Sequence, residues 1–82
     1  MRASLYYEEK RVGLGEEFLD GVQEAIYQIR KYPLAWSVFE GEYRRYLMKR
    51  FPYGVVYRVE TDIIFIIAVA HLRRKPDYWK SR

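Results

Sequence analysis

The residues best suited to chemistry gather near the C-terminal end of the sequence. The single histidine is followed closely by cations and aromatic rings, and the group comprises His71, Arg73, Arg74, Lys75, Tyr78 and Trp79. Such a mixture is suited to phosphate contacts and to base stacking. His71 and Tyr78 are the candidates for proton transfer, although a lone histidine at a strand end is more often a hydrogen-bonding residue than a catalyst. The alternative for Tyr78 and Trp79 is that they anchor the C-terminal tail to the sheet.

A second group of cations lies in the region where strands are expected, and it comprises Arg44, Arg45, Lys49, Arg50 and Arg58. Successive side chains of a strand alternate between its two faces, so these residues do not all face one partner. Arg58 is expected on the face opposite the apolar residues of its strand, and we therefore expect it to contact a ligand. An ion pair with Glu60 or Asp62 is the competing interpretation.

Several kinds of catalytic site are missing from the sequence. It contains no glycine-rich phosphate loop, no nucleophile elbow, no cysteine and no pair of histidines at metal-ligating spacing. We therefore expect neither a metal nor another cofactor. Adjacent acids such as Glu8 and Glu9 diverge by about 100° on a helix, so they indicate a solvated helical face rather than paired catalytic carboxylates.

Charge is distributed unevenly along the chain. Residues 1–42 carry five basic and eight acidic side chains, whereas residues 43–82 carry ten basic and three acidic ones, and the overall formal charge is +4. The basic half is suited to an anionic partner such as nucleic acid. The alternative is that these charges only keep the protein in solution.

Hydrophobic periodicity predicts a helical hairpin in the N-terminal half. Between residues 16 and 31 apolar side chains recur at spacings of three and four, which is typical of an amphipathic helix. Acids lie at its start and cations at its end, as the helix dipole favours, and Pro33 ends it at Tyr32. A shorter helix over residues 3–11 precedes it, and Gly13 and Gly15 form a tight connection between the two.

The pattern becomes extended after residue 42. Residues 53–60 alternate between the two faces, and residues 63–70 are apolar on both, as expected of a strand with neighbours on both sides. Residues 43–50 are expected to form the first strand, with turns at residues 51–54 and 60–62. Residues 32–42 are expected to be a connection whose aromatic side chains pack on the core. The predicted class is therefore α+β, with an N-terminal helical hairpin packed on a three-stranded antiparallel meander and a basic C-terminal tail.

The length of 82 residues predicts one small domain over residues 1–82 with a thin core. The longest apolar stretch is far shorter than the ~20 residues that a membrane span requires. The N-terminus lacks the pattern of a signal peptide, and the absence of cysteine favours a reducing compartment. We therefore expect a cytoplasmic protein that does not bind membranes.

An ordered series of motifs along the chain resembles the RelE/ParE superfamily of bacterial type II toxin–antitoxin toxins, also described as plasmid stabilisation proteins. The motifs are Tyr6-Tyr7-Glu8-Glu9, residues 13–18, Arg44-Arg45, residues 50–53, residues 56–59 and residues 70–79. The resemblance implies a helical hairpin on an antiparallel sheet, a cognate antitoxin that wraps and neutralises the toxin, and a role in growth arrest. Its target would be DNA gyrase or messenger RNA on the ribosome.

Two departures from the family pattern bear on partners and target. Members usually open with a strand and a longer first helix, so the sheet is expected to lack one strand here. Residues 63–70 at an edge would invite pairing, and a missing segment, a second copy or the antitoxin is expected to complete the sheet. By resemblance, the mRNA-cleaving branch carries one arginine early in the strand that here reads Gly54-Val55-Val56-Tyr57 and another just after the last strand, at about Leu72, and neither of these positions is basic in this chain. By resemblance the chain is therefore closer to ParE, whose members poison gyrase without catalysis.

Three functions remain open on these grounds. The first is a gyrase-binding toxin whose contacts come from Arg73, Arg74, Lys75 and the neighbouring aromatic side chains. The second is a metal-independent endoribonuclease acting on the ribosome. In it His71 or Tyr78 moves protons, while phosphate binding and stabilisation of the transition state come from Arg45, Lys49, Arg58 and Arg73. The third is a truncated, non-toxic relative that retains only antitoxin binding.

Overall fold

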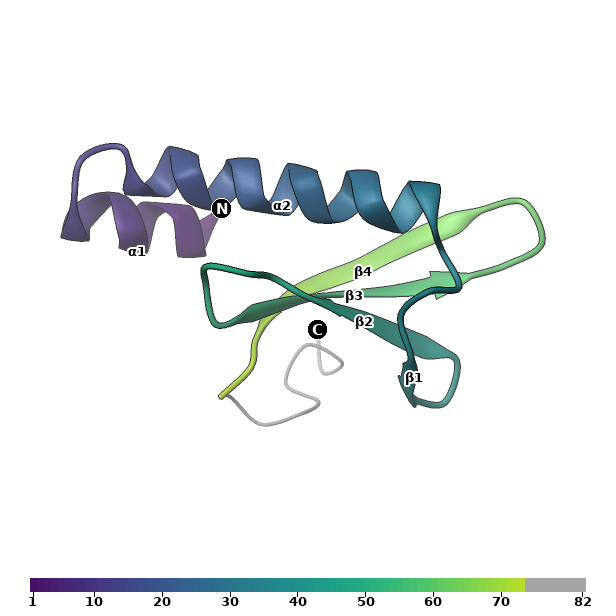
Figure 1. Cartoon of the computed structure of the whole chain (residues 1–82). Helices are drawn as coiled ribbons and strands as arrows, with labels where there is room; N and C mark the ends of the chain where they lie inside the picture. Colours follow the sequence, from purple (N-terminus) through teal and green to yellow (C-terminus); the bar gives the residue numbers. More distant parts are fainter. Residues whose placement is uncertain (74–82) are drawn as a thin grey trace.

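The computed structural model describes residues 1–73, which form two helices followed by a four-stranded antiparallel sheet (Figure 1). The helices are α1 (Arg2–Lys10) and α2 (Leu14–Lys31), and the strands are β1 (Val38–Glu40), β2 (Tyr43–Leu47), β3 (Tyr53–Val59) and β4 (Ile64–His71). The strands lie in the order β1-β2-β3-β4, each antiparallel to its neighbour. The predicted α+β class and helical hairpin are confirmed.

α2 is the helix that covers the sheet. Its apolar stripe supplies the fully buried side chains Phe18, Ala25 and Ile29, which pack against Val55 and Tyr57 of β3. Burial of this stripe, rather than intrinsic propensity, accounts for most of the stability of such a helix. Neither helix of residues 1–73 is both long enough and apolar enough to cross a membrane.

The junction between α1 and α2 is held by one carboxylate. Both oxygens of Glu8 accept the backbone N–H of Gly13 at 3.0 and 3.1 Å, and one of them also accepts the N–H of Gly15. Gly13 has a positive φ of 88°, and a side chain on Gly15 would collide with the carbonyl oxygen of Ser4. Glu8 therefore satisfies N–H groups at the start of α2 that otherwise lack a partner.

Replacing Glu8 with alanine is expected to lower the free energy of unfolding by about 1 kcal/mol, because the N–H groups of Gly13 and Gly15 lose their acceptor. Urea denaturation followed by circular dichroism would measure the change. Glu9→Ala is the matched control, since it removes the same charge from the next residue of α1 and should shift the midpoint much less. Equal shifts in the two variants would contradict the capping role.

Tyr57 ties the sheet to the end of α2. Its side chain is fully buried, and its hydroxyl donates a hydrogen bond to the carbonyl oxygen of Pro33 at 2.7 Å. Burial raises the pKa of the Tyr57 phenol above its usual 10.0, and the nearby Arg44 offsets part of that rise. The neutral phenol is thus the form that the fold stabilises.

Tyr57→Phe is expected to cost about 1 kcal/mol at neutral pH, because the carbonyl of Pro33 loses its donor. Since the folded-state pKa is raised, the stability from Tyr57 is present below pH 10 and is lost as the pH rises further. Above that pH the variant should therefore lose stability less steeply than the parent. Parallel slopes from urea titrations at several alkaline pH values would contradict this prediction.

The sheet differs from the prediction in having a fourth strand. Val38–Glu40, expected to lie in a connection, forms β1, which pairs with β2 through Val38↔Arg44 and Glu40↔Tyr43. The two strands are joined through Gly41, whose positive φ of 55° suits a tight hairpin turn. The expected anchoring of aromatic side chains from this region is confirmed by Trp36, which packs against the core and lies tilted at 59° to the ring of Tyr46, with ring centroids 4.8 Å apart.

Two further predictions about the sheet are wrong. β2 ends at Leu47 rather than at residue 50, because the chain turns there so that Met48 and Phe51 are both buried beside α2. β4 was expected to have neighbours on both sides, yet within residues 1–73 it pairs only with β3 and lies at the edge of the sheet. The hairpin turn predicted between β3 and β4 is confirmed by reciprocal backbone hydrogen bonds between Glu60 and Ile63.

The sheet presents two different faces. Tyr46, Val55 and Tyr57 point towards α2 and belong to the main core. Alternate residues point the other way, where Val56 and Ala70 are buried in a smaller cluster that includes Phe39, Tyr43 and Ala68. We call this second side the helix-distal face. Because side chains alternate along β2 and β3, the cations of these strands are divided between the two faces.

Candidate functional site

The cations singled out in the sequence separate into three settings. Arg45 and Arg58 lie on the helix-distal face, Arg73 lies with His71 at the end of β4, and Arg44 and Arg50 make internal contacts. Arg74, Lys75, Tyr78 and Trp79 fall outside the described residues.

Arg45 and Arg58 form what we call the distal arginine pair. Arg45 lies opposite Val56, and Arg58 lies opposite Tyr43, so the two arginines are diagonal neighbours on one face. Each guanidinium stacks on a ring, Arg45 on Phe39 and Arg58 on Phe65, with the guanidinium carbon 4.8 Å from the ring centroid in both cases. Stacking of this kind restricts the side chain and leaves the edge of the guanidinium available for anionic groups.

The stem of Arg45 crosses the sheet directly above Gly54. A side chain at Gly54 would meet Arg45 Cγ at 2.9 Å and Cδ at 3.0 Å, and Leu72 lies 3.3 Å away. Glycine at this position of β3 therefore leaves room for Arg45 to lie flat across the sheet. This explains how a residue without a side chain positions an arginine of the neighbouring strand.

For Arg58 the sequence predicts either a position on the open face of the sheet or an ion pair with Glu60 or Asp62, and the structure shows both the position and the ion pair with Glu60. It points to the helix-distal face, as predicted, and it also forms an ion pair with Glu60 at 3.2 Å. Its Nε is buried without a hydrogen-bond partner in the described part of the chain. The carboxylate of Glu60 is the more exposed partner of this ion pair, and ion pairs near the surface contribute only about 0–1 kcal/mol.

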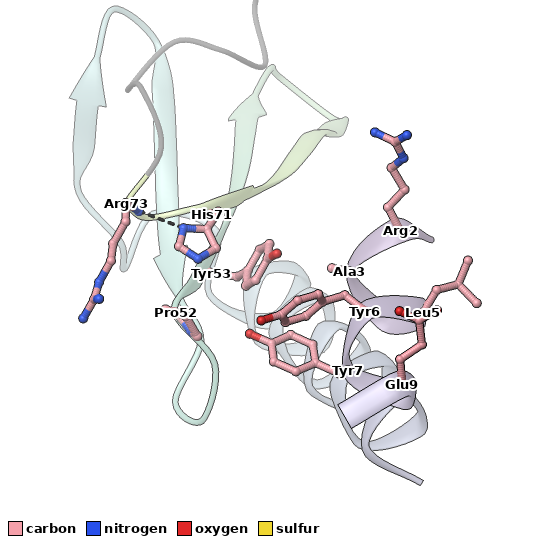
Figure 2. Close-up of a pocket in the computed structure, with 10 residues that line it drawn as sticks. All are labelled: Arg2, Ala3, Leu5, Tyr6, Tyr7, Glu9, Pro52, Tyr53, His71 and Arg73. Atoms are coloured by element: carbon pink, nitrogen blue, oxygen red, sulfur yellow. Dashed lines mark hydrogen bonds between the residues drawn. The ribbon is translucent and has the colours of Figure 1, made fainter. Parts of the chain in front are cut away.

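His71 and Arg73 line a cleft of ≈ 640 Å³ between α1 and the end of the sheet (Figure 2). Tyr6 and Tyr7 reach into it from α1, and Tyr53 reaches into it from β3. The imidazole of His71 packs edge-on against Tyr53 with centroids 4.9 Å apart. This volume lies in the range of small-molecule sites and of grooves that accept one or two side chains of a partner.

A hydrogen bond fixes the orientation of the histidine ring. Nδ1 of His71 accepts the backbone N–H of Arg73 at 3.0 Å, so the neutral ring carries its proton on Nε2 (Figure 2). Arg73 extends beyond His71, and Arg2 lies across the cleft at the start of α1. In this view the guanidinium groups of Arg2 and Arg73 point away from the imidazole on either side, so the three groups do not converge on one point of the cleft (Figure 2).

Two of the candidate catalytic residues, His71 and Arg58, lie on different faces of the sheet. His71 pairs with Tyr53 on the helix side of the sheet, whereas Arg58 is on the helix-distal face. A catalytic site requires its base and its charge-stabilising groups to converge on one reacting atom. Within residues 1–73 the structure brings together His71 and Arg73 but separates both from Arg58.

Two of the remaining cations, Arg44 and Arg50, have structural partners. Arg44 donates to the carbonyl oxygen of Trp36 at 2.7 Å and so holds the connection between α2 and β1. Arg50 pairs with Glu17, which also accepts a hydrogen bond from Arg11 at 3.2 Å. The hydrogen bond from Arg50 lowers the pKa of the Glu17 carboxyl, and Arg11 adds to that effect. Lys49 is exposed beside a smaller pocket of ≈ 220 Å³ under α2.

The tyrosines of the cleft were missed by reasoning from sequence. Tyr6 and Tyr7 are adjacent on α1, and nothing in their spacing shows that they face the end of a strand far along the chain. Over the described residues, no three acidic, histidine or cysteine side chains lie close enough to hold a metal ion.

A helical hairpin followed by an antiparallel meander, with arginines on the sheet, defines a small α+β domain of the kind expected for a RelE/ParE-type toxin. The family described as ParE toxin of type II toxin-antitoxin system, parDE, matches residues 2–76, and the chain belongs to this family. A search of curated proteins and a search of solved structures found no match.

Proposed function

We propose that this ParE-family toxin arrests growth by binding DNA gyrase, without catalysing a reaction itself, and that it serves in plasmid stabilisation. The observation that carries the proposal is the division of its candidate catalytic residues, because His71 and Arg58 lie on opposite faces of the sheet. A binding protein does not need these groups to converge. Membership of the ParE family supports the same conclusion.

The distal arginine pair is the part of the surface that we propose contacts the target. Arg45 and Arg58 are held in place by their stacking on Phe39 and Phe65. Restricting long side chains before binding reduces the entropy lost on association. Arginine residues positioned in this way are frequent among the side chains that dominate binding free energy.

A ribosome-dependent endoribonuclease is the second candidate function, and the cleft at His71 favours it. There the imidazole lies beside tyrosine rings on which bases would stack, and Arg73 and Arg2 lie at the margins of the same cleft. In that case the reaction would be metal-independent, with His71 as the proton carrier and Arg73 as the stabilising cation.

Induced expression followed by two assays on the same cells tests these functions. Gyrase-dependent DNA cleavage complexes without ribosomal mRNA cuts are the result that we expect. Codon-phased cuts in mRNA without cleavage complexes would establish the nuclease instead. Normal growth at full expression would contradict both and indicate a non-toxic relative.

We propose that a cognate antitoxin neutralises the toxin by covering its apolar surface. Leu5 on α1 and Leu19 on α2 are exposed, and the tyrosine-lined cleft lies beside α1. An amphipathic helix or strand with acidic residues fits these features together with the arginines.

Antitoxin binding is expected to raise the thermal midpoint of the toxin, since a ligand present at about a thousand times its dissociation constant adds roughly 4 kcal/mol. A small domain should gain more than about 10 °C from such an increase. Differential scanning fluorimetry with the protein encoded by the neighbouring reading frame would measure it. An unchanged midpoint at saturating antitoxin would contradict neutralisation by binding to the folded toxin.

We also propose that the sheet edge formed by β4 pairs with a second copy of the chain. Support comes from the position of β4 at the end of the strand order and from its uncharged sequence.

A further inference from the structure

The two edges of the sheet are protected very differently. β1 is three residues long, contains Glu40, and has an irregular register against β2. β4 is eight residues long, and residues 63–70 include no charged side chain. Natural edge strands usually carry a charge, a proline or a strong irregularity that prevents pairing with another chain. β1 has two of these protections, whereas β4 has only the bulge opposite Val56 and Tyr57.

The side chains of β4 are exposed despite being apolar. Phe65, Ile66 and Ile67 have 37%, 40% and 38% of their surface accessible, which is high for consecutive large apolar residues in a strand. Along residues 1–73 no other strand lies against the outer side of β4. An extended, apolar partner would pair with the backbone of β4 and remove these side chains from water.

Charges lie at both ends of this edge and have opposite signs. Glu60 and Asp62 precede β4 in the turn that joins it to β3, and Arg73 follows its last residue. In an antiparallel pair of two β4 strands, the acidic end of each copy lies beside the cationic end of the other. A parallel pair would instead place acid beside acid and arginine beside arginine.

We infer that two copies of this chain join antiparallel through β4, with Asp62 of each copy close to Arg73 of the other. This inference rests on the proposed pairing at the β4 edge and assigns its direction and its charge contacts. The two-fold axis runs perpendicular to the sheet between Ile67 and Ala68, the midpoint of Asp62 and Arg73, so the sheets merge into one and the helices of both copies cover the same side. Opposite charges at both ends select this arrangement over the parallel one.

Charge reversal provides a direct test. Asp62→Arg and Arg73→Asp each place like charges together at both ends of the pair, so each variant alone should dimerise at least about tenfold more weakly than the parent. When the two variants are mixed, arginine faces aspartate at both ends again, and a mixed dimer should form with near-parental affinity. Sedimentation equilibrium with one variant fluorescently labelled would measure all three constants, and circular dichroism would check folding.

Substitutions at the two edges supply a matched control. Ile67→Lys places a charge in the middle of β4 and should abolish dimerisation, whereas Val38→Lys places the same charge on β1 and should leave it unchanged.

The possible failures are distinguishable. A parent chain that stays monomeric at all concentrations would overturn pairing through β4 altogether, without touching the proposed action on gyrase. A dimer that forms equally in the parent and in both charge variants would overturn the antiparallel direction. The antiparallel direction would also be overturned if each charge variant dimerises weakly alone and the two variants do not form a mixed dimer.

Discussion

Replacing Phe18 with alanine is expected to lower the free energy of unfolding by about 3–5 kcal/mol. Phe18 is fully buried and lies in an aromatic cluster, with centroids 5.3 Å from Tyr7, 5.0 Å from Phe51 and 5.1 Å from Tyr53. These rings come from α1, from the connection before β3 and from β3 itself. Removing Phe18 therefore opens a cavity where all of these elements meet.

A loss of this size approaches the whole stability of a small domain, which is about 5 kcal/mol or a little more. The variant should be largely unfolded in circular dichroism at 37 °C. Leu19→Ala, at the adjacent and 40% exposed position, is the control and should cost less than about 1 kcal/mol. A cooperative transition of Phe18→Ala close to that of the parent would show that the cluster does not hold the helices on the sheet.

Neutralising the distal arginine pair is expected to remove toxicity while the fold is retained. In the double variant Arg45→Gln and Arg58→Gln the side-chain stems remain, but the target loses two charge-assisted contacts worth about 1.5–3 kcal/mol each. Affinity for gyrase should fall at least about a hundredfold, as measured by surface plasmon resonance.

Lys10→Gln with Lys31→Gln is the matched control for that double variant. Lys10 lies over the ring of Tyr6 and Lys31 over that of Tyr27, so the control removes the same charge and the same kind of contact from the helices. It should keep both affinity and toxicity. Equal losses in the two double variants would mean that net charge, rather than the position of the arginines, governs binding.

The helices were predictable because their signals are local. The stripe from Phe18 to Ile29, the glycines at the junction and Pro33 all act within a few residues of where they stand.

The first strand, β1, could not be predicted in this way. Its three residues are too few to show an alternating pattern, they follow a proline-containing stretch, and the hairpin depends on the positive φ of Gly41, which the sequence does not reveal.

The candidate site was predictable only in part. Alternation along a strand correctly placed Arg58 on the face away from the main core. It also required Arg44 and Arg45 to face opposite ways, but not which of them is used internally. That depends on the carbonyl of Trp36, which comes close to Arg44 only after the chain has turned back on itself. The role of Glu17 in pairing with Arg50 is equally invisible in the sequence, since 33 positions separate the two residues.

The uneven charge distribution also has a structural explanation that the sequence alone does not supply. Part of the basic half is neutralised by the acidic half, because Glu17 of α2 binds Arg50 as well as Arg11. Among the described residues Arg45 forms no ion pair, and its guanidinium lies over the ring of Phe39 instead. The cations that remain for a partner are therefore fewer and more localised than the count of basic residues indicates.

The stoichiometry of gyrase inhibition tests the central claim that this toxin acts by binding rather than by catalysis. Purified toxin would be titrated into gyrase at concentrations well above their dissociation constant, and supercoiling of relaxed plasmid would be followed over time. A toxin that acts by binding should give inhibition that grows with the molar ratio, is complete near equivalence with the gyrase subunits and does not progress after mixing. Complete and progressive loss of activity at a small fraction of equivalence, or no inhibition at any ratio, would contradict it.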